Sequence, residues 1–253
     1  MDITQKVIAI TGAGRGLGRA IALSLAEQGA QLALIDVNRT DLEVTEAEVR
    51  SRDGRCALFV CNVASEPEVE ATFAAIKGQF GALQGLVNCA GILRDGMLIK
   101  VKEGALTEKM SLAQWQSVID VNLTGTFLCG REGAALMATG GEGGVIINIS
   151  SIARAGNMGQ SNYAASKAGV ASLVVTWGKE LARHGIRVMG IAPGVFATDM
   201  TAAMKPEAMA RMQQAIPVGT LGQAAQLAQT VQFILANDYL SGRMIELDGG
   251  LRL

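Results

Sequence analysis

Tyr163 and Lys167 stand four positions apart in a stretch with a helical pattern, so their side chains share one helix face. A phenol has a free pKa of about 10 and is a poor base at neutral pH. A nearby ammonium favours the phenolate, so the pair predicts a tyrosine that passes a proton to a carbonyl or takes one from an alcohol. Pairs with this spacing also occur in ordinary amphipathic helices, so the interpretation depends on the rest of the chain.

A glycine-rich turn near the N-terminus supports the interpretation of Tyr163 and Lys167 as a proton-transfer pair. An apolar run over residues 7–10 ends at Thr11, and glycines follow at positions 12, 14, 16 and 18. A helical repeat then runs to a glycine at 29, and a second apolar run ends on Asp36. Glycines let a pyrophosphate approach the backbone at a helix N-terminus, and a carboxylate at Asp36 would accept from a ribose 2′-hydroxyl. This strand–turn–helix–strand unit predicts dinucleotide binding rather than a plain turn.

Length and composition restrict the function classes. The chain has 253 residues, of which 49% are hydrophobic, so we expect one α/β domain over residues 1–253. A net charge of -1 argues against nucleic acid and anionic membranes as partners. There is no apolar run of the roughly 18 residues that a membrane span needs. The first strand begins by Val7, which leaves no room for a secretory signal, so we expect a cytoplasmic protein.

Cysteine and histidine usage excludes two further kinds of site. The four cysteines include no C-x-x-C pair, and we expect free thiols in a reducing compartment. His184 is the single histidine, so neither a zinc site nor Ser-His-Asp catalysis is expected. We expect His184 at the surface and no metal.

Strand-like and helix-like segments alternate along the chain, which predicts a doubly wound parallel sheet, a Rossmann fold of about seven strands with helices on both faces. One long helix is expected over 115–137 and another over 163–183. Residues 92–112 are the least patterned and are interpreted as a surface loop with room for a short helix. A methionine-rich stretch over 200–212 would serve equally as an adaptable apolar lid or as plain core packing.

Small and polar residues follow the expected strands at the sheet edge where such folds bind ligands. The segments that contain these residues resemble segments of the short-chain dehydrogenase/reductase family, and the resemblance covers nearly the whole chain. The matching segments are Thr11 to Gly18, Asn88-Cys89-Ala90-Gly91, Val121-Asn122, Ser150-Ser151, Tyr163 to Lys167, Ala192-Pro193-Gly194, Thr198-Asp199-Met200 and Asp248-Gly249-Gly250. The resemblance, together with the strand ends, implies a cofactor site formed by Gly12, Arg15, Gly16, Leu17, Gly18, Asp36, Asn62, Val63, Asn88, Ala90, Gly91, Pro193, Gly194 and Thr198.

The same resemblance implies four catalytic residues: Asn122, Ser151, Tyr163 and Lys167. In that family the lysine also binds the nicotinamide ribose, a serine hydrogen-bonds the substrate oxygen, and the asparagine holds a water in a proton relay. Counting back from Tyr163 by the family's usual interval selects Ser150, whereas aligning the strand end selects Ser151. Strand ends vary less than loops, so we expect Ser151 to be the catalytic serine.

Asp36 accepts from a 2′-hydroxyl and repels a 2′-phosphate, which predicts a preference for NAD(H). Arg15 and Arg39 would partly offset that repulsion, so NADP(H) remains possible.

Within the family, the chain is most similar to 3-oxoacyl-[acyl-carrier-protein] reductases, notably over Gly159 to Tyr163 and Ile216 to Gly222. A 3-oxoacyl thioester is therefore the expected substrate. The alternatives are an NAD-dependent dehydrogenase of a hydroxyacyl-CoA, steroid or polyol, and, more remotely, a non-catalytic NAD-sensing protein. An acyl carrier protein as partner stays open, because the turn over 138–142 lacks basic residues. The resemblance also implies a homotetramer formed through the long helices and the C-terminal strand.

Overall fold

The computed structural model describes residues 1–197 and 206–252, and its centre is a parallel sheet. Its strands are β1 (Val7–Thr11), β2 (Gln31–Asp36), β3 (Arg55–Val60), β4 (Gly85–Asn88), β7 (Gly144–Ile149), β8 (Ile186–Pro193) and β9 (Arg243–Leu247). They lie in the order β3-β2-β1-β4-β7-β8-β9, so this 7-stranded sheet confirms the predicted Rossmann topology. The strand order reverses direction between β1 and β4, where such folds bind ligands.

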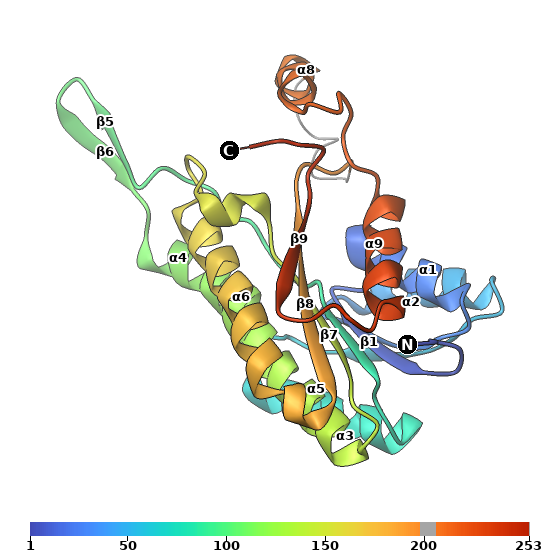
Figure 1. The fold of residues 1–253 in the computed structure, drawn as a ribbon. Helices are drawn as coiled ribbons and strands as arrows, with labels where there is room; N and C mark the ends of the chain where they lie inside the picture. Colours follow the sequence, from blue (N-terminus) through green and yellow to red (C-terminus); the bar gives the residue numbers. More distant parts are fainter. Residues whose placement is uncertain (198–205, 253) are drawn as a thin grey trace.

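Helices cover both faces of the sheet (Figure 1). One face packs against α1 (Gly16–Ala26), α2 (Arg39–Arg50) and α9 (Ala224–Ala236), and the other against α3 (Glu66–Phe80), α5 (Gly125–Gly140) and α6 (Ser161–Glu180). Successive side chains of β1 point to opposite faces of the sheet, so this strand contributes to the hydrophobic core on each face. Ile8 and Ile10 belong to the first cluster, whereas Val7 and Ala9 belong to the second. After α6, a short 3-10 helix, η3 (Ala182–His184), leaves His184 exposed, as expected.

The helix expected over 115–137 is interrupted. It consists of α4 (Leu112–Ile119), a π-helical turn η1 (Asp120–Thr124) and then α5. A π turn adds a residue without ending the helix, so an apolar repeat cannot reveal it, and such turns are frequent at functional sites. Asn122 lies inside this turn and is fully buried.

The prediction of a surface loop over 92–112 was wrong. The segment contains an antiparallel hairpin of β5 (Ile99–Lys102) and β6 (Ala105–Lys109), which projects from the body in Figure 1. Glu103 and Gly104 connect the strands with φ angles of 52° and 77°, the left-handed pair of a tight hairpin turn. The apolar–lysine alternation over 99–102 and this Glu-Gly pair were the available signals.

Part of the methionine-rich stretch, including Met200 and Met204, lies outside the described residues, as does Thr198. The described remainder forms α8 (Pro206–Ala215). Among the described helices there is none with the length and apolar character needed to cross a bilayer.

Candidate active site

The glycine turn between β1 and α1 admits no side chains at its tightest points. A Cβ on Gly18 would lie 2.1 Å from the Gly12 carbonyl oxygen, and Gly12 itself has a φ of 69°. Gly16 has a φ of 55° but open space around its Cβ position. Arg15 is exposed beside it, while the Leu17 side chain packs on the core. The start of α1 therefore presents its main-chain N–H groups to open space, as a pyrophosphate site requires.

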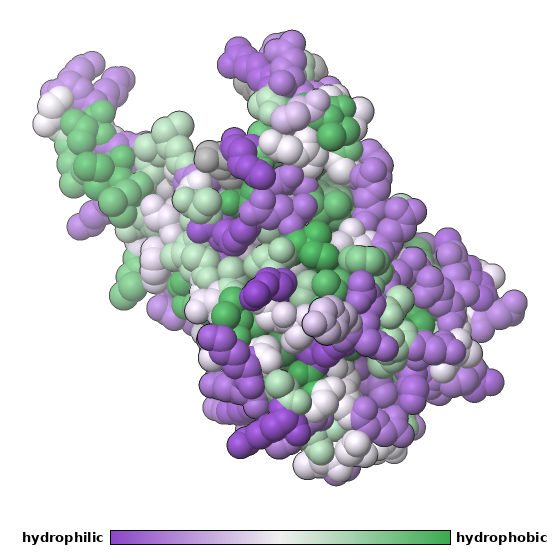
Figure 2. Space-filling view, in the orientation of Figure 1, coloured by the Kyte–Doolittle hydropathy of each residue, from purple (hydrophilic) through white to green (hydrophobic). Residues whose placement is uncertain are grey.

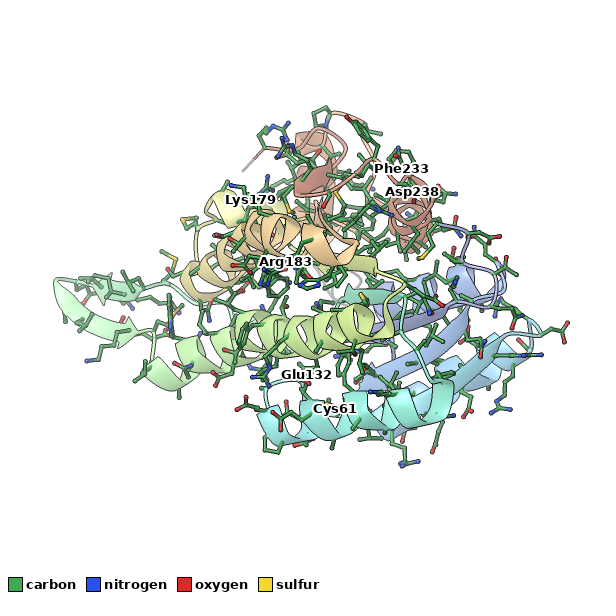
Figure 3. The ribbon with its side chains drawn as sticks, turned by 60° about the horizontal axis from the view of Figure 1, so that its bottom comes forward. Cys61, Glu132, Lys179, Arg183, Phe233 and Asp238 are labelled. Carbon is green, nitrogen blue, oxygen red and sulfur yellow. The ribbon has the colours of Figure 1, made fainter. Side chains whose placement is uncertain are left out.

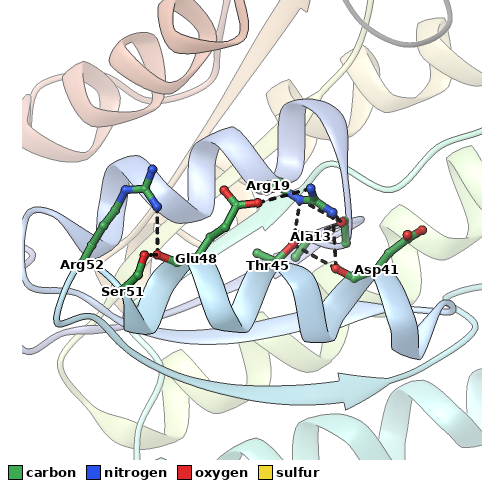
Figure 4. A network of polar contacts seen from close by, with 8 residues as sticks. Ala13, Arg19, Asp41, Thr45, Glu48, Ser51 and Arg52 are labelled. Atoms are coloured by element: carbon green, nitrogen blue, oxygen red, sulfur yellow. Dashed lines mark hydrogen bonds and ion pairs between the residues drawn. The ribbon is translucent and has the colours of Figure 1, made fainter.

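Two residues that the sequence analysis missed brace this turn (Figure 4). The buried Thr45 hydroxyl lies 3.0 Å from the Ala13 carbonyl oxygen and 3.1 Å from that of Gly14. The Arg19 guanidinium donates to the Gly14 carbonyl and, over 3.0 Å, to Thr45 Oγ1. Their contacts order the main chain on which the predicted pyrophosphate site depends. The position of Thr45 on the apolar face of α2 was the one available signal.

Asp36 ends β2 with its carboxylate turned toward the glycine turn. Its Oδ2 accepts from the Gly14 N–H over 3.0 Å, and its Oδ1 accepts from the Asn38 N–H over 3.0 Å. A Cβ on Gly14 would lie 2.9 Å from Oδ2, so only glycine permits this approach. The carboxylate is thus held in one orientation beside the start of α1.

The end of β4 joins the glycine turn to the tyrosine helix. Thr11 Oγ1 accepts from the main-chain N–H groups of Cys89 and Ala90, each over 3.1 Å. A Cβ on Gly91 would lie 3.3 Å from Asn122 Oδ1 and 3.5 Å from Lys167 Nζ. Gly91 therefore stands directly beside two of the predicted catalytic side chains.

The remaining described residues of the predicted cofactor site lie at strand ends, and they differ in burial and in hydrogen bonding. Asn88 is buried, and its Nδ2 donates sideways to Asn148 Oδ1 over 2.9 Å, leaving its own Oδ1 without a hydrogen-bond partner. Asn62 is exposed, whereas Val63 is buried and faces Gly125 at the start of α5. Pro193 ends β8, and the Gly194 N–H donates to the Leu247 carbonyl over 2.9 Å.

Ser151, Tyr163 and Lys167 come together at the start of α6. The Ser151 hydroxyl lies close enough to the Tyr163 phenol to lower its pKa, and Lys167 Nζ lies 5.7 Å from the centroid of the Tyr163 ring. Ser151 Oγ also accepts from the Ala153 N–H over 3.1 Å. The neighbouring Ser150 points elsewhere, because its hydroxyl donates to the Lys167 carbonyl over 2.8 Å. The geometry therefore favours Ser151 over Ser150 as the partner of the tyrosine.

Burial shifts the pKa values of both side chains, and for Tyr163 the shift is opposite to the expected direction. It raises the pKa of Tyr163 to about 12, the nearby Asp95 and Cys89 also raise it, and the Ser151 hydroxyl opposes them. Burial lowers the pKa of Lys167 to about 8, and its Nζ donates to the Ile149 carbonyl over 2.8 Å. The sequence-based expectation of a lowered phenol pKa considered the ammonium but not the loss of solvent. Within this chain the protonated phenol is the favoured form.

Asn122 is held at both ends of its amide by one residue. Its Oδ1 accepts from the Ile92 N–H over 2.8 Å, and its Nδ2 donates to the Ile92 carbonyl over 3.0 Å. The same Nδ2 lies 3.2 Å from Ser166 Oγ. The side chain thus ties the π turn to the segment after β4 and to α6.

A second group of polar residues fixes the segment before the hairpin, and the sequence analysis assigned it no role. Asn162 Nδ2 and Gln114 Nε2 both donate to the Arg94 carbonyl over 2.9 Å. Gln160 Nε2 donates to Asp95 Oδ2 over 2.8 Å. We call Asn162, Gln114 and Gln160 the polar clamp, because they hold residues 94–95 against the chain that precedes Tyr163.

Cysteine and metal chemistry have little basis in the described part of the chain. All four cysteines are free, and burial raises the pKa of the Cys89 thiol to about 11, away from a reactive thiolate. Within residues 1–197 and 206–252, there is no cluster of three or more His, Cys, Asp or Glu side chains that could hold a metal ion.

Residues 6–208 match the short chain dehydrogenase family. The chain belongs to this family. Over 255 residues it is 38% identical to a 3-oxoacyl-[acyl-carrier-protein] reductase of Staphylococcus aureus, covering 99% of both chains. It is 39% identical to a rat (Rattus norvegicus) protein of the same name over 250 residues, covering 98% of this chain and 99% of the relative. A short-chain dehydrogenase is an oxidoreductase that uses NAD(P), so the chain is an enzyme of that class.

Solved structures agree with this assignment. The fold is similar to that of a 7 alpha-hydroxysteroid dehydrogenase complexed with NADH and 7-oxo glycochenodeoxycholic acid. The TM-score is 0.91 at 30% sequence identity, covering 99% of this chain and 95% of the other.

Proposed function

We propose that the enzyme reduces a carbonyl to a secondary alcohol, or reverses that reaction, with Tyr163 as the group that passes the proton. The approach of the Ser151 hydroxyl to the Tyr163 phenol, with Lys167 one turn further along α6, carries this proposal. A substrate oxygen placed between the two hydroxyls would bind Ser151 and receive the Tyr163 proton.

A dinucleotide fits the residues present. Side chains are excluded at Gly12 and Gly18, the space at Gly16 is open, and Asp36 is fixed beside the turn. When bound, the nicotinamide supplies or accepts the hydride. Lys167 and Asn122, both beside Gly91, would hold its ribose and organise the proton path, while the start of α1 would bind the pyrophosphate.

The raised pKa of Tyr163 suits proton donation, because the phenol is protonated at neutral pH. In the reductive direction this is the form required. Oxidation needs the phenolate, and a positive charge close to the phenol would lower its pKa toward that form. The chain's own groups therefore favour reduction.

For the cofactor we propose a preference for NAD(H), with NADP(H) possible. The fixed Asp36 carboxylate supports this, because it repels a 2′-phosphate and can accept from a 2′-hydroxyl. Arg15 and Arg39 are exposed nearby in the sequence and would soften the discrimination.

A 3-oxoacyl thioester is the proposed substrate, supported by the two reductases of that name that match the chain over nearly their whole length. A steroid-type alcohol is the second candidate, since the hydroxysteroid dehydrogenase shares the fold over nearly the whole chain.

Steady-state reduction of a 3-oxoacyl thioester, with NADH and with NADPH, tests the proposal. We expect turnover that is faster with NADH and that disappears in Tyr163→Phe. Absence of turnover with both cofactors would exclude the thioester. A panel of secondary alcohols with NAD, including a hydroxysteroid, would then test the second candidate.

We also propose a cytoplasmic homotetramer. The α6 residues Ala168 and Val175 are exposed within the chain, so this face does not pack in the core. β9 is an edge strand of the sheet, and Phe233 of α9, on the face of the sheet opposite to α6, is 54% exposed. Both surfaces fit packing against further copies of the chain.

A further inference from the structure

The hairpin of β5 and β6 has two chemically different faces. Register pairs Val101 with Leu106 and Ile99 with Lys109, so the three apolar side chains share one face. The other face carries Lys100 and Glu108, which form an ion pair. Such a division between an apolar and a charged face is typical of an antiparallel sheet that is covered on one side.

That apolar face is uncovered within the chain. Ile99, Val101 and Leu106 are between 54% and 59% exposed, and Leu98 at the base of the hairpin is 66% exposed. Figure 2 shows hydrophobic atoms gathered on the projecting hairpin, and in Figure 3 it extends beyond the end of the α4 and α5 helices. A two-stranded hairpin is marginal in water by itself, so this one needs a covering surface.

The apolar face continues onto the helices. The Met110 N–H donates to the Leu98 carbonyl over 3.0 Å, which brings the end of the hairpin to the start of α4. There Leu112 is 77% exposed, and Phe127 on α5 is 42% exposed. Helix α4 and the π turn that leads into α5 lie against α6, whose exposed residues Ala168 and Val175 were assigned above to contact between copies. The hairpin therefore extends a surface that a second copy would already cover.

From this continuity we infer that the hairpin is an intersubunit arm, whose apolar face (Leu98, Ile99, Val101 and Leu106) docks on a second copy of this chain. The inference rests on the homo-oligomer proposed above. Its charged face, with Lys100 and Glu108, stays in solvent. A symmetric pair of copies would exchange two such arms.

The polar clamp connects this arm to the catalytic helix. Gln114 and Asn162 hold the Arg94 carbonyl, and Gly96, just before the hairpin, donates its N–H to the Gly159 carbonyl over 2.8 Å. An arm fixed on a neighbouring copy would thereby steady the segment that precedes Tyr163.

The test replaces the apolar face in one variant and the charged face in a matched control. Val101→Lys with Leu106→Lys places charge in the inferred contact, whereas Lys100→Gln with Glu108→Gln removes only the exposed ion pair. Sedimentation velocity over a concentration series measures the association of each protein, and circular dichroism checks that each is folded. Hydrogen exchange reports protection of the amides over 99–109.

We expect the native protein to be oligomeric with protected hairpin amides, and the lysine variant to associate at least about tenfold more weakly. The control should associate as the native protein does. If the native protein is oligomeric and the lysine variant associates equally well, the inference that the hairpin is an intersubunit arm is wrong, whereas the proposed homo-oligomer is supported. A native protein that is monomeric over the whole concentration series overturns both the arm and the homo-oligomer. The catalytic proposal is tested separately, by turnover of the thioester.

A lipid surface is the other occupant to be excluded. Phosphatidylglycerol vesicles that pellet the native protein but not the lysine variant, together with unchanged association in solution, would overturn the inference in favour of a membrane.

Discussion

Tyr163 and Lys167 share a helix face, yet burial moves their pKa values apart, to about 12 for the phenol and about 8 for the ammonium. The sum of the two shifts favours a neutral pair rather than the phenolate–ammonium pair. Catalytic acids and bases are commonly found where burial perturbs a pKa in this way.

Two tyrosines are present in the chain, which makes the phenol pKa directly measurable. Tyr239 is 99% exposed, so Tyr239→Phe leaves Tyr163 as the single source of tyrosinate absorbance. Because the folded pKa is raised, we expect no tyrosinate up to about pH 11, well past the free value of about 10, while the protein stays folded. Saturating NAD should lower the onset. Tyrosinate appearing below pH 9.5 without NAD would contradict the burial argument.

The two adjacent serines provide a matched pair of variants. Ser151→Ala removes the hydroxyl that lies beside the phenol, so kcat should fall by about 10²–10³-fold. Ser150→Ala removes a hydrogen bond to the Lys167 carbonyl, so its main effect should be on stability, about 1 kcal/mol. Steady-state kinetics and thermal unfolding of both variants separate the roles. The reverse order of effects on kcat would assign the chemistry to Ser150.

Asp36→Ser tests the cofactor preference. The substitution removes the negative charge and keeps a short hydrogen-bonding side chain beside Gly14. We expect the ratio of kcat/KM for NADH to that for NADPH to fall by about tenfold or more, since one charge contact is worth at least about 1.4 kcal/mol. An unchanged ratio would place the discrimination elsewhere, with Arg15 and Arg39 as the next residues to replace.

At the scale of elements, the segments before and within α6 set the position of the tyrosine. Asn162 is fully buried, and its amide both donates to the Arg94 carbonyl and accepts from the Tyr163 N–H. The α4 residue Gln114 supports the same carbonyl. Helix α6, helix α4 and the base of the hairpin therefore meet around one main-chain segment.

Asn162→Ala should lower kcat by about tenfold or more and cost about 1–3 kcal/mol of stability, because it leaves buried main-chain groups with fewer partners. Asn157→Ala is the matched control, since its exposed side chain bonds only Gln160 among the described contacts. We expect the control to retain kcat and melting temperature. Equal kcat values for the two variants would remove Asn162 from the positioning of Tyr163.

Helices and strands were predicted correctly from the sequence where the apolar repeat was long, and they were missed where a short turn set the structure. The helix expected over 163–183 is observed as α6 (Ser161–Glu180), with the short helix η3 (Ala182–His184) at its end. The hairpin over 99–109 was misread because its apolar residues are few and its turn is only two residues long. The π turn was missed because it preserves the helical pattern on both sides.

For the whole molecule, the exposed face of α6 offers the test of assembly. Ala168→Arg adds a long charged side chain at a position that is exposed within the chain, so the single subunit should fold normally. We expect the proposed tetramer to dissociate, as measured by sedimentation velocity. Glu43→Arg on the exposed side of α2, on the opposite face of the sheet, is the control and should leave assembly intact. A tetramer that survives Ala168→Arg would require a different interface.

The sequence by itself determined the sheet architecture, the glycine turn and the placing of Tyr163 and Lys167 on one helix face. These depend on apolar periodicity and on spacing along one strand or helix, which the order of residues expresses directly. The acid that ends β2 and the tyrosine and lysine of α6 belong to this group.

Tertiary structure alone decided which serine faces the phenol, in which direction the pKa values of Tyr163 and Lys167 move, and that the hairpin exposes an apolar face. Each depends on which groups from distant parts of the chain surround an atom and how much solvent they exclude. Burial opposes charge on both members of the pair, and only the packed fold sets its extent.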